Sequence, residues 1–481
     1  MIFKNLSILS VAIFVFTTNS FAQSEEEQRN KAVFNKLEFF LNTQQTDSIY
    51  AMAAPSFQEA ISKENLSSSL TNLYALGKIK NSNVEKFSKG AALYRLSFES
   101  TDLGMVLSID ANMQYTGLLF QAIEAKQVNL KPKEEVLAKV ETKNPLDFFI
   151  DSLARTYVQQ QHAQSLAVAV IHKNKLNSFF YGETAPGNGT LPDGNTIYEI
   201  GSISKTMTAT LLAELVNKGT IALDDSIAKF LPDSVAQNPD IQKITFKMLA
   251  NHTSGLPRLP GNIGKMPKFK DADPYAIYDR KALFSYLKDA KLNREPETAY
   301  EYSNLGFGLL GELISIIYKK PFMQVMKEQL FTPLEMTASS DKIDPKNKNI
   351  AKPHDKTGKE VPFWNFQAMA GAGAIKTSMD DLLRYSIAQL KFPETDIQRA
   401  MAQTLQFTYF NPPNTDIGLA WHMNMVEDQI YFHHSGGTGG SSSFIAIVPD
   451  EKSVVIVLSN SALSCESIGV KLLEKVLKTK D

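Results

Sequence analysis

The sequence predicts an α/β chain of two domains: a small α+β domain, and then a larger domain built on an antiparallel sheet flanked by helices. The small domain is indicated by a change of pattern, because apolar residues recur at helical spacing from residue 25 to about 79 and at strand spacing from 91 to about 124. The large domain is indicated by strand-like runs at both of its ends. A chain of 481 residues, 43% of them hydrophobic, is long enough for two cores.

The first 22 residues have the three parts of a bacterial-type export signal. Lys4 lies in a short n-region, an apolar run covers residues 6–16, and Ser20-Phe21-Ala22 is typical of a cleavage site. We therefore expect cleavage after Ala22 and a periplasmic or secreted mature protein. No later stretch approaches the ~20 apolar residues of a membrane-spanning helix. The only cysteine, Cys465, excludes an internal disulfide, and we expect it to be buried.

The accessory α+β domain is expected over residues 23–125, a linker over 126–145 and the main domain over 146–481. The linker is rich in Lys and Glu and is punctuated by Pro132 and Pro145. The main domain is expected to begin with a helix over residues 148–161 and a hairpin of two strands over 165–171 and 176–181. Near its end we expect two further strands, over 444–448 and 454–458, and a closing helix over 468–477. The two ends are expected to share one sheet, with a helical region from the middle of the chain beside it.

Composition and motif searches exclude several classes of function. The net charge of −1 and the lack of any Lys/Arg block argue against nucleic-acid binding. The sequence contains no H-E-x-x-H motif, which would indicate a metal hydrolase. It also contains no G-x-S-x-G motif, which would indicate an α/β-hydrolase. We expect no metal and no cofactor, and the sequence gives no indication of an oligomeric state.

Ser202 and Lys205 lie three residues apart where an apolar helical pattern begins. This spacing puts both on one face of a helix. A serine hydroxyl is a weak nucleophile, but a lysine in a site that disfavours its charge can accept the proton. The free N–H groups at the helix start would also favour an oxyanion. A plain helix N-cap is the more common use of such a serine.

The same four-residue pattern also occurs at residues 226–229, 285–288 and 339–342. Ser226 and Ser285 lie in charged segments, which are typical of solvated helices, whereas Ser202 follows a glycine at a strand-to-helix transition. We therefore select Ser202.

Two further motifs follow in order: Tyr302-Ser303-Asn304 opens another apolar helix, and His434-Ser435-Gly436 is expected before a strand. With these motifs, residues 146–477 resemble the class C β-lactamase and D-alanyl-D-alanine peptidase superfamily. A second copy of the tyrosine motif, Tyr409 to Asn411, lies beside two prolines with no helix after it.

Further stretches that resemble the superfamily, outside the three motifs, lie at residues 252–256, 333–337, 371–373 and 377–381. Taken alone, His252 is more typical of a packed turn histidine than of a catalyst.

The resemblance implies a β-lactamase-like domain, with an all-helical subdomain, and a role for each motif residue. Ser202 would attack a carbonyl centre and form an acyl-enzyme, while Lys205 and Tyr302 share the proton, with the identity of the base left open. Asn304 would bind a polar group of the acyl side. The backbone N–H groups of Ser202 and Gly437 would bind the oxyanion, with Gly437 on a strand that follows the third motif.

His434 departs from the superfamily pattern, in which a lysine at this position meets a substrate carboxylate. A neutral imidazole would cost an anionic substrate about 1 to 3 kcal/mol of charge-assisted bonding. We therefore expect a serine hydrolase of esters, amides or peptides, an esterase or D-amino-acid-type peptidase more than a β-lactamase, with Ser435 and Gly436 also lining the substrate site. His433 should point to the opposite side of the strand. The alternative is a catalytically silent protein that binds cell-wall peptide or a protein partner.

Overall fold

A computed structural model describes residues 25–478 except 89, 99–100, 124–129, 133–135, 174, 293, 412–415 and 427. The chain divides into two compact units, Met1–Lys126 and Gln127–Asp481. The expected export signal and much of the expected linker lie outside the described residues. Within the described part, no helix is long and apolar enough to cross a membrane.

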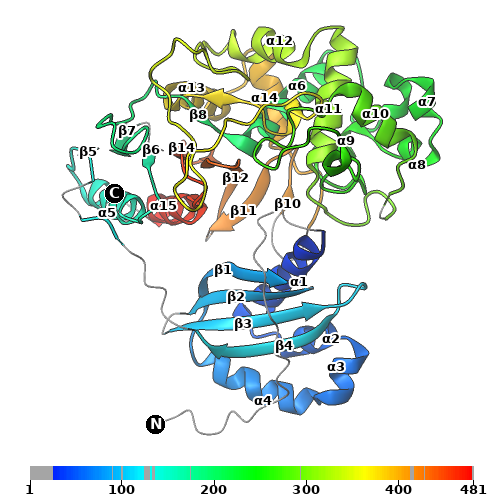
Figure 1. Cartoon of the computed structure of the whole chain (residues 1–481), viewed down its shortest axis with the longest axis vertical. Helices are drawn as coiled ribbons and strands as arrows, with labels where there is room; N and C mark the ends of the chain where they lie inside the picture. Colours follow the sequence, from blue (N-terminus) through cyan, green and yellow to red (C-terminus); the bar gives the residue numbers. More distant parts are fainter. Residues whose placement is uncertain are drawn as a thin grey trace. The chain divides into compact units, whose positions relative to one another are not determined.

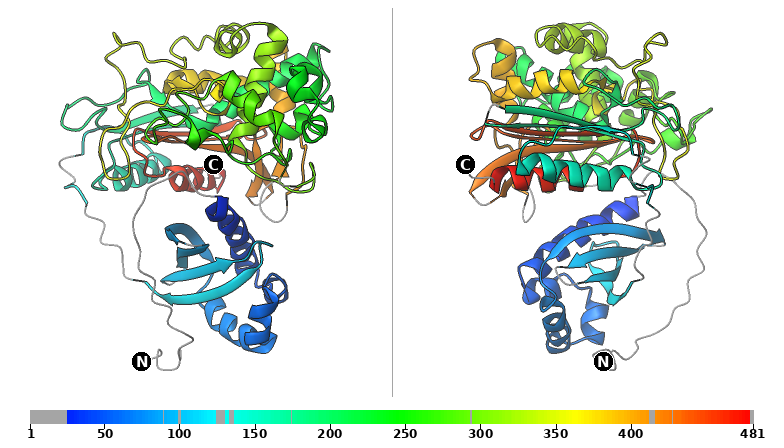
Figure 2. Two further views of the ribbon diagram at one scale, coloured as in Figure 1. Left: turned by 45° about the vertical axis from the view of Figure 1, so that its right-hand side comes forward. Right: turned by 90° about the vertical axis from the view of Figure 1, so that its left-hand side faces the viewer.

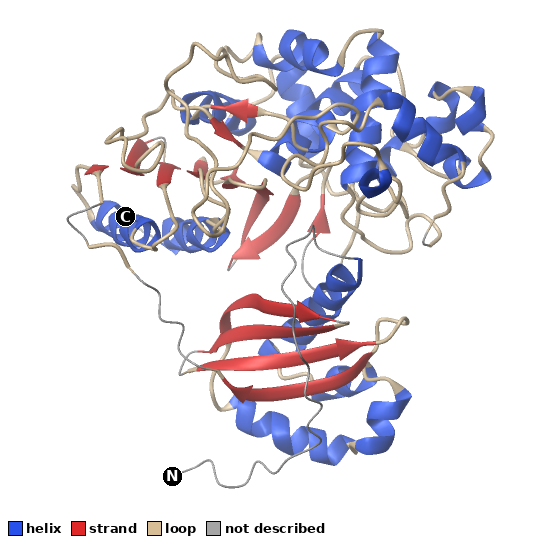
Figure 3. Cartoon of the chain, viewed as in Figure 1, coloured by secondary structure: helices blue, strands red, loops and turns tan. Residues whose placement is uncertain are grey.

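The first unit packs four helices on a four-stranded antiparallel sheet (Figures 1 and 3). The sheet order is β1-β2-β3-β4. The elements are α1 (Glu25–Asn42), α2 (Thr46–Ala51), α3 (Pro55–Ala60), α4 (Lys63–Tyr74), β1 (Ile79–Ser88), β2 (Ala91–Phe98), β3 (Asp102–Ile109) and β4 (Tyr115–Ala122). Buried Asn30 joins α1 to the sheet, because its Oδ1 accepts from the Tyr94 hydroxyl at 2.8 Å and its Nδ2 donates to the Leu107 carbonyl at 2.9 Å. The sequence did not predict β1, an edge strand in which only Ile79 is fully buried.

The second unit is built on an eight-stranded sheet in the order β10-β11-β12-β13-β14-β6-β7-β5. Its strands are β5 (Ala138–Lys139), β6 (Ser165–His172), β7 (Lys175–Gly182), β10 (Asp416–Ile417), β11 (His422–Val426), β12 (Gln429–Gly437), β13 (Ser442–Val448) and β14 (Ser453–Ser459). Strands β6 and β14 are antiparallel neighbours, so the two ends of the domain share one sheet, as expected. A separate two-stranded sheet joins β8 (Tyr198–Glu199) to β9 (Lys376–Thr377).

The central strands are apolar on both faces because helices cover both sides (Figure 2). On β6, Ala167 and Ala169 face the helical region, whereas Val168 and Val170 face the terminal helices α5 (Pro145–Val158) and α15 (Glu466–Lys478). The helical region contains α6 (Ser204–Asn217), α7 (Asp233–Ala236), α8 (Pro239–Gln242), α9 (Phe246–Ala250), α10 (Arg280–Lys288), α11 (Asn304–Tyr318), α12 (Phe322–Met326), α13 (Met379–Leu390) and α14 (Asp396–Thr404). Cys465 is buried, as predicted.

One sequence expectation about the third motif was wrong. All four residues from His434 to Gly437 are the last residues of β12, so Gly437 does not lie on the strand that follows the motif, β13, which begins at Ser442. Gly436 and Gly437 pair with Ser443 and Ser442 of β13. Glycines usually indicate a turn, but here the lack of a side chain allows a strand to approach another segment closely. A β-carbon on Gly436 would collide with the carbonyl oxygen of Ile200.

Candidate active site

Ser202 lies in a single 3₁₀ turn, Gly201–Ile203, that leads directly into α6. Gly201 has a φ of +48°, which glycine adopts without steric cost. Ser202 is partly exposed, whereas Lys205, one helical turn later, is fully buried. The turn therefore leaves the hydroxyl partly exposed and holds the amine in the interior, one helical turn later.

The amine of Lys205 has three oxygen neighbours and no carboxylate partner among the residues that the structure describes. Its Nζ lies 3.0 Å from Ser202 Oγ, 2.8 Å from Asn304 Oδ1 and 2.7 Å from the Ala372 carbonyl oxygen. Burial lowers the pKa of Lys205 well below its usual range, and the charge of Arg258 lowers it further. A neutral amine has two N–H groups for Asn304 and Ala372, which leaves its lone pair for the Ser202 hydroxyl.

Tyr302 precedes α11, and its hydroxyl hydrogen-bonds the Ser202 side chain. Burial raises the pKa of Tyr302 to about 12, although the charge of Arg258 and the Ser202 hydrogen bond act in the opposite direction. The phenol therefore keeps its proton at neutral pH. The Lys205 Nζ lies 4.8 Å from the centre of the Tyr302 ring, so hydroxyl, amine and phenol share one small space.

His252 and Ser303 fix the position of Tyr302. The Ser303 hydroxyl accepts from the backbone N–H of Gly306 at 2.9 Å and so caps α11. The Ser303 N–H donates to His252 Nδ1 at 3.0 Å, and the His252 ring lies 4.4 Å from the ring of Tyr302. His252 is buried, so it is the packed, hydrogen-bonded turn histidine that its sequence context indicated.

Asn304, the first residue of α11, connects Lys205 to an aromatic cluster. Its Oδ1 accepts from the lysine, and its Nδ2 donates to the Tyr275 hydroxyl at 3.2 Å. The Tyr275 ring stacks on Phe366 at 4.9 Å and meets the edge of Trp364 at 5.5 Å. These three rings, which we call the aromatic wall, lie beside Asn304.

The end of β12 lies against the turn that carries Ser202. A β-carbon on Gly201 would be only 2.7 Å from the Gly437 nitrogen and 2.8 Å from the Gly437 oxygen. Beyond it, Thr438 donates its hydroxyl to Glu199 at 2.7 Å, and the same carboxylate accepts from the Trp364 N–H at 2.7 Å. Glu199 therefore ties the strand end to the aromatic wall.

His434 is almost completely buried, and its Nδ1 donates to the Ser435 carbonyl oxygen at 2.7 Å. Its Nε2 and the Ser435 hydroxyl have no hydrogen-bond partner within the described structure. Burial lowers the pKa of His434 well below its usual range, and the neighbouring His422 acts in the same direction. The imidazole is therefore neutral at pH 7. Adjacent His433 points away and packs on Phe444.

Sequence reasoning did not single out Arg258, Tyr275 or Glu199, because none belongs to a spaced motif. The only available signal was the loop over residues 257–275, whose Pro, Gly and Lys content permits many shapes. Arg258 lies in this loop, and Tyr275 is its last residue. Their proximity to Ser202 depends on the tertiary fold.

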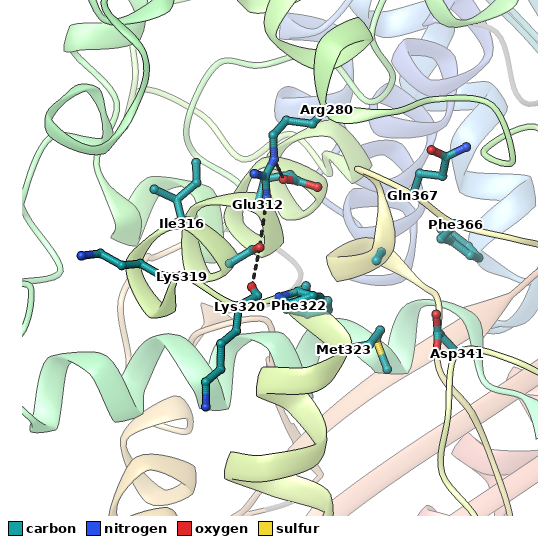
Figure 4. A pocket seen from close by; sticks show the side chains of 13 residues that line it. Arg280, Glu312, Ile316, Lys319, Lys320, Phe322, Met323, Asp341, Phe366 and Gln367 are labelled. Atoms are coloured by element: carbon teal, nitrogen blue, oxygen red, sulfur yellow. Dashed lines mark hydrogen bonds and ion pairs between the residues drawn. The ribbon is translucent and has the colours of Figure 1, made fainter.

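A separate pocket lies around the C-terminal half of α11 (Figure 4). Arg280 pairs there with Glu312 and donates to Ser315 Oγ at 3.0 Å. This pocket includes neither Ser202 nor Lys205. Phe366, which lines this pocket, also stacks on Tyr275.

Residues 150–468 match the family model described as Beta-lactamase, which covers well over half of the chain. The chain belongs to the Beta-lactamase family. It is 30% identical over 320 residues to the D-alanyl-D-alanine-carboxypeptidase/endopeptidase AmpH of Escherichia coli K12, covering 63% of this chain and 81% of that protein. A beta-lactamase of Pseudomonas fluorescens is 28% identical over 283 residues, covering 57% and 73%.

Solved structures share the fold of the second unit. A class C beta-lactamase superposes with a TM-score of 0.63 at 24% identity, over 71% of this chain and 99% of that one. A beta-lactamase/D-alanine carboxypeptidase from Pseudomonas syringae gives 0.62 at 23% identity, over 70% and 100%. The family assignment makes this protein a serine hydrolase and confirms the superfamily that the three motifs indicated.

Burial of the Lys205 amine predicts a pH-dependent stability. The folded-state pKa is lower than the unfolded value of about 10.4, so between the two the unfolded chain binds more protons, and the unfolding free energy rises with pH. Relative to Lys205→Met, we expect the unfolding free energy of the wild type to rise between pH 7 and 9.5 by up to about 1.4 kcal/mol per pH unit. Urea denaturation at several pH values measures this. The exposed-lysine control Lys265→Met should run parallel to the wild type, and a parallel Lys205→Met curve would contradict the lowered pKa.

Proposed function

We propose that this chain is an exported hydrolase that cleaves ester, amide or peptide bonds through an acyl-enzyme at Ser202. The observation that supports this most directly is the contact of Ser202 Oγ with the buried Lys205 amine at 3.0 Å. The amine, with its lone pair free, accepts the hydroxyl proton as Ser202 attacks the carbonyl carbon. The hydroxyl of Tyr302 then donates a proton to the leaving group and is reprotonated through Lys205, since the three groups exchange protons as one unit.

The developing oxyanion is stabilised by the backbone N–H groups of Ser202 and Gly437. The close approach of Gly201 to Gly437 supports this role, because it brings the end of β12 beside the nucleophile. Donors held in place before the reaction cost no reorganisation when charge develops. Water then attacks the acyl-enzyme, and the same groups return the proton to Ser202. Asn304 orients the acyl side while it holds Lys205.

The substrate preference follows from the neutral charge of His434. A buried, uncharged imidazole gives no fixed cation at the third motif for a substrate carboxylate. Substrates with a carboxylate at that point lose charge-assisted bonding, which favours esters, and D-amino-acid-type peptides without a carboxylate at that point, over β-lactams. The named relatives include both a carboxypeptidase/endopeptidase and beta-lactamases, which all act on carbonyl centres.

A binding protein without turnover is the second candidate from the sequence. The contacts argue against it, because a protein that only binds has no need for an amine that lacks a carboxylate partner. Burying such an amine lowers the stability of the folded protein, whereas a well-packed apolar side chain at the same place would not. The retained amine is therefore better explained by chemistry than by binding.

Covalent labelling tests the nucleophile. A fluorophosphonate probe should attach to Ser202 with loss of fluoride, and Ser202→Ala should abolish labelling. Ser226→Ala is the matched control, because Ser226 heads the same S-x-x-K pattern but caps a short turn, and this variant should label like the wild type. Mass spectrometry of the labelled peptide locates the adduct. Equal labelling of wild type and Ser202→Ala, or none of either, would refute the proposed nucleophile.

Competing substrates test the preference. We expect kcat/KM for 4-nitrophenyl butyrate to exceed that for a chromogenic cephalosporin by at least about tenfold, because the cephalosporin carboxylate finds no cation at His434. Initial rates measured by absorbance give both values. Cephalosporin hydrolysis at a comparable kcat/KM would show that the neutral histidine does not restrict β-lactam binding.

Substitution of Gly201 tests the oxyanion site. In Gly201→Ala the new methyl group would press on Gly437 and displace one donor, so kcat for ester cleavage should fall about 100-fold. Gly219→Ala is the control, since Gly219 also has a positive φ, +67°, but nothing lies within 4 Å of an added β-carbon. Both variants should be compared for kcat and thermal stability. Equal losses of kcat in the two would mean that backbone strain alone causes the effect.

A further inference from the structure

Arg258 places a cation beside Tyr302 of the second motif. Its guanidinium carbon lies 5.2 Å from the centre of the Tyr302 ring. Its backbone carbonyl accepts from the N–H groups of Asn304 and Leu305, both at 3.0 Å, so the residue is anchored to the first turn of α11. The side chain is only partly buried and is therefore open to a ligand.

The Arg258 charge has no internal counter-ion in the described part of the chain. Three carboxylates that lie close in sequence to Tyr302, to Ser202 or within the loop of Arg258 have other partners. Glu301 pairs with Arg294, Glu199 lies 3.9 Å from Lys376, and Asp273 accepts from the Asn365 backbone at 2.8 Å and side chain at 2.7 Å. A partly desolvated guanidinium without a carboxylate is poised to bind one bidentately from a ligand.

The position of Arg258 identifies the side of the substrate that it faces. Arg258 is bound to Asn304 through the backbone, and its charge acts on the hydroxyl of Tyr275, which bonds the Asn304 side chain. Asn304 is the residue that we assign to the acyl side. Arg258, Asn304 and Tyr275 thus form one polar edge, and Tyr275 joins this edge to Phe366 and Trp364 of the aromatic wall.

We propose that Arg258 determines specificity by binding a carboxylate carried on the acyl part of the substrate. The inference rests on the proposed acyl-enzyme function and adds the class of acyl group. The cation that His434 does not provide at the third motif is thereby supplied beside Tyr302 of the second motif. The preferred substrates are then esters or peptides whose acyl group ends in a free carboxylate a few bonds from the scissile carbonyl.

Matched esters test this assignment. Mono(4-nitrophenyl) glutarate carries the carboxylate on its acyl group, and 4-nitrophenyl glutaramate replaces it with a neutral amide of the same shape. In Arg258→Gln, kcat/KM for the glutarate should fall about 10- to 100-fold more than for the glutaramate, after subtraction of spontaneous hydrolysis. Arg258→Lys should recover part of the loss, because it keeps the charge but not the planar fork. Lys265→Gln, which removes an exposed cation from the same loop, should leave the ratio unchanged.

Each other outcome overturns the proposal. Equal losses for both esters would mean that Arg258 acts through the protonation of Lys205 and Tyr302, or through folding. A selective loss for 3-carboxyphenyl butyrate, whose carboxylate is on the leaving group, would place the anion on the wrong side. Glutaramate cleavage and fluorophosphonate labelling that depend on Ser202 would still support the proposed function in both cases. If the wild type cleaves neither ester and takes no label, the proposed function fails as well.

Discussion

The site is organised around the burial of one amine without a carboxylate to balance its charge. A carboxylate beside Lys205 would hold the proton and remove the lone pair that faces Ser202. The chain instead surrounds the amine with two neutral acceptors, the Asn304 amide and the Ala372 carbonyl, from different segments. The stability lost by burying this group is the physical cost of having a proton acceptor at neutral pH.

Two helix starts and one strand end meet at this amine. Helix α6 carries Lys205 directly after the 3₁₀ turn of Ser202, α11 begins at Asn304, and the glycines that end β12 approach the Ser202 turn. Because side chains are absent at Gly201 and Gly436, the backbones come within reach of each other. The eight-stranded sheet, covered on both faces, supplies the rigid support that holds these segments in register.

The charges around Ser202 differ from the family pattern, and that difference supports the proposed substrate preference. His434 is buried and neutral where the pattern has a cation, whereas Arg258 is partly exposed and has no counter-ion in the described structure. In the carboxylate-binding role that we propose for Arg258, the recognition of an anionic group moves from the third motif to the acyl side. Specificity would then depend on a loop, while the acyl-transfer chemistry depends on the helices and the strand.

The sequence by itself determined the helices and strands whose apolar residues recur at a regular period. It also determined the site residues that lie only a few positions apart in the chain. The strand runs at both ends of the main domain, the pairing of Ser202 with Lys205 and the helix start at Asn304 all follow from neighbouring residues. Only the tertiary structure decided that β1 forms an edge strand, that Gly436 and Gly437 extend β12, and that Arg258 reaches Tyr302. The reason is that strand pairing, close backbone approach and desolvation each depend on contacts between segments far apart in the chain. A local sequence pattern does not contain this information.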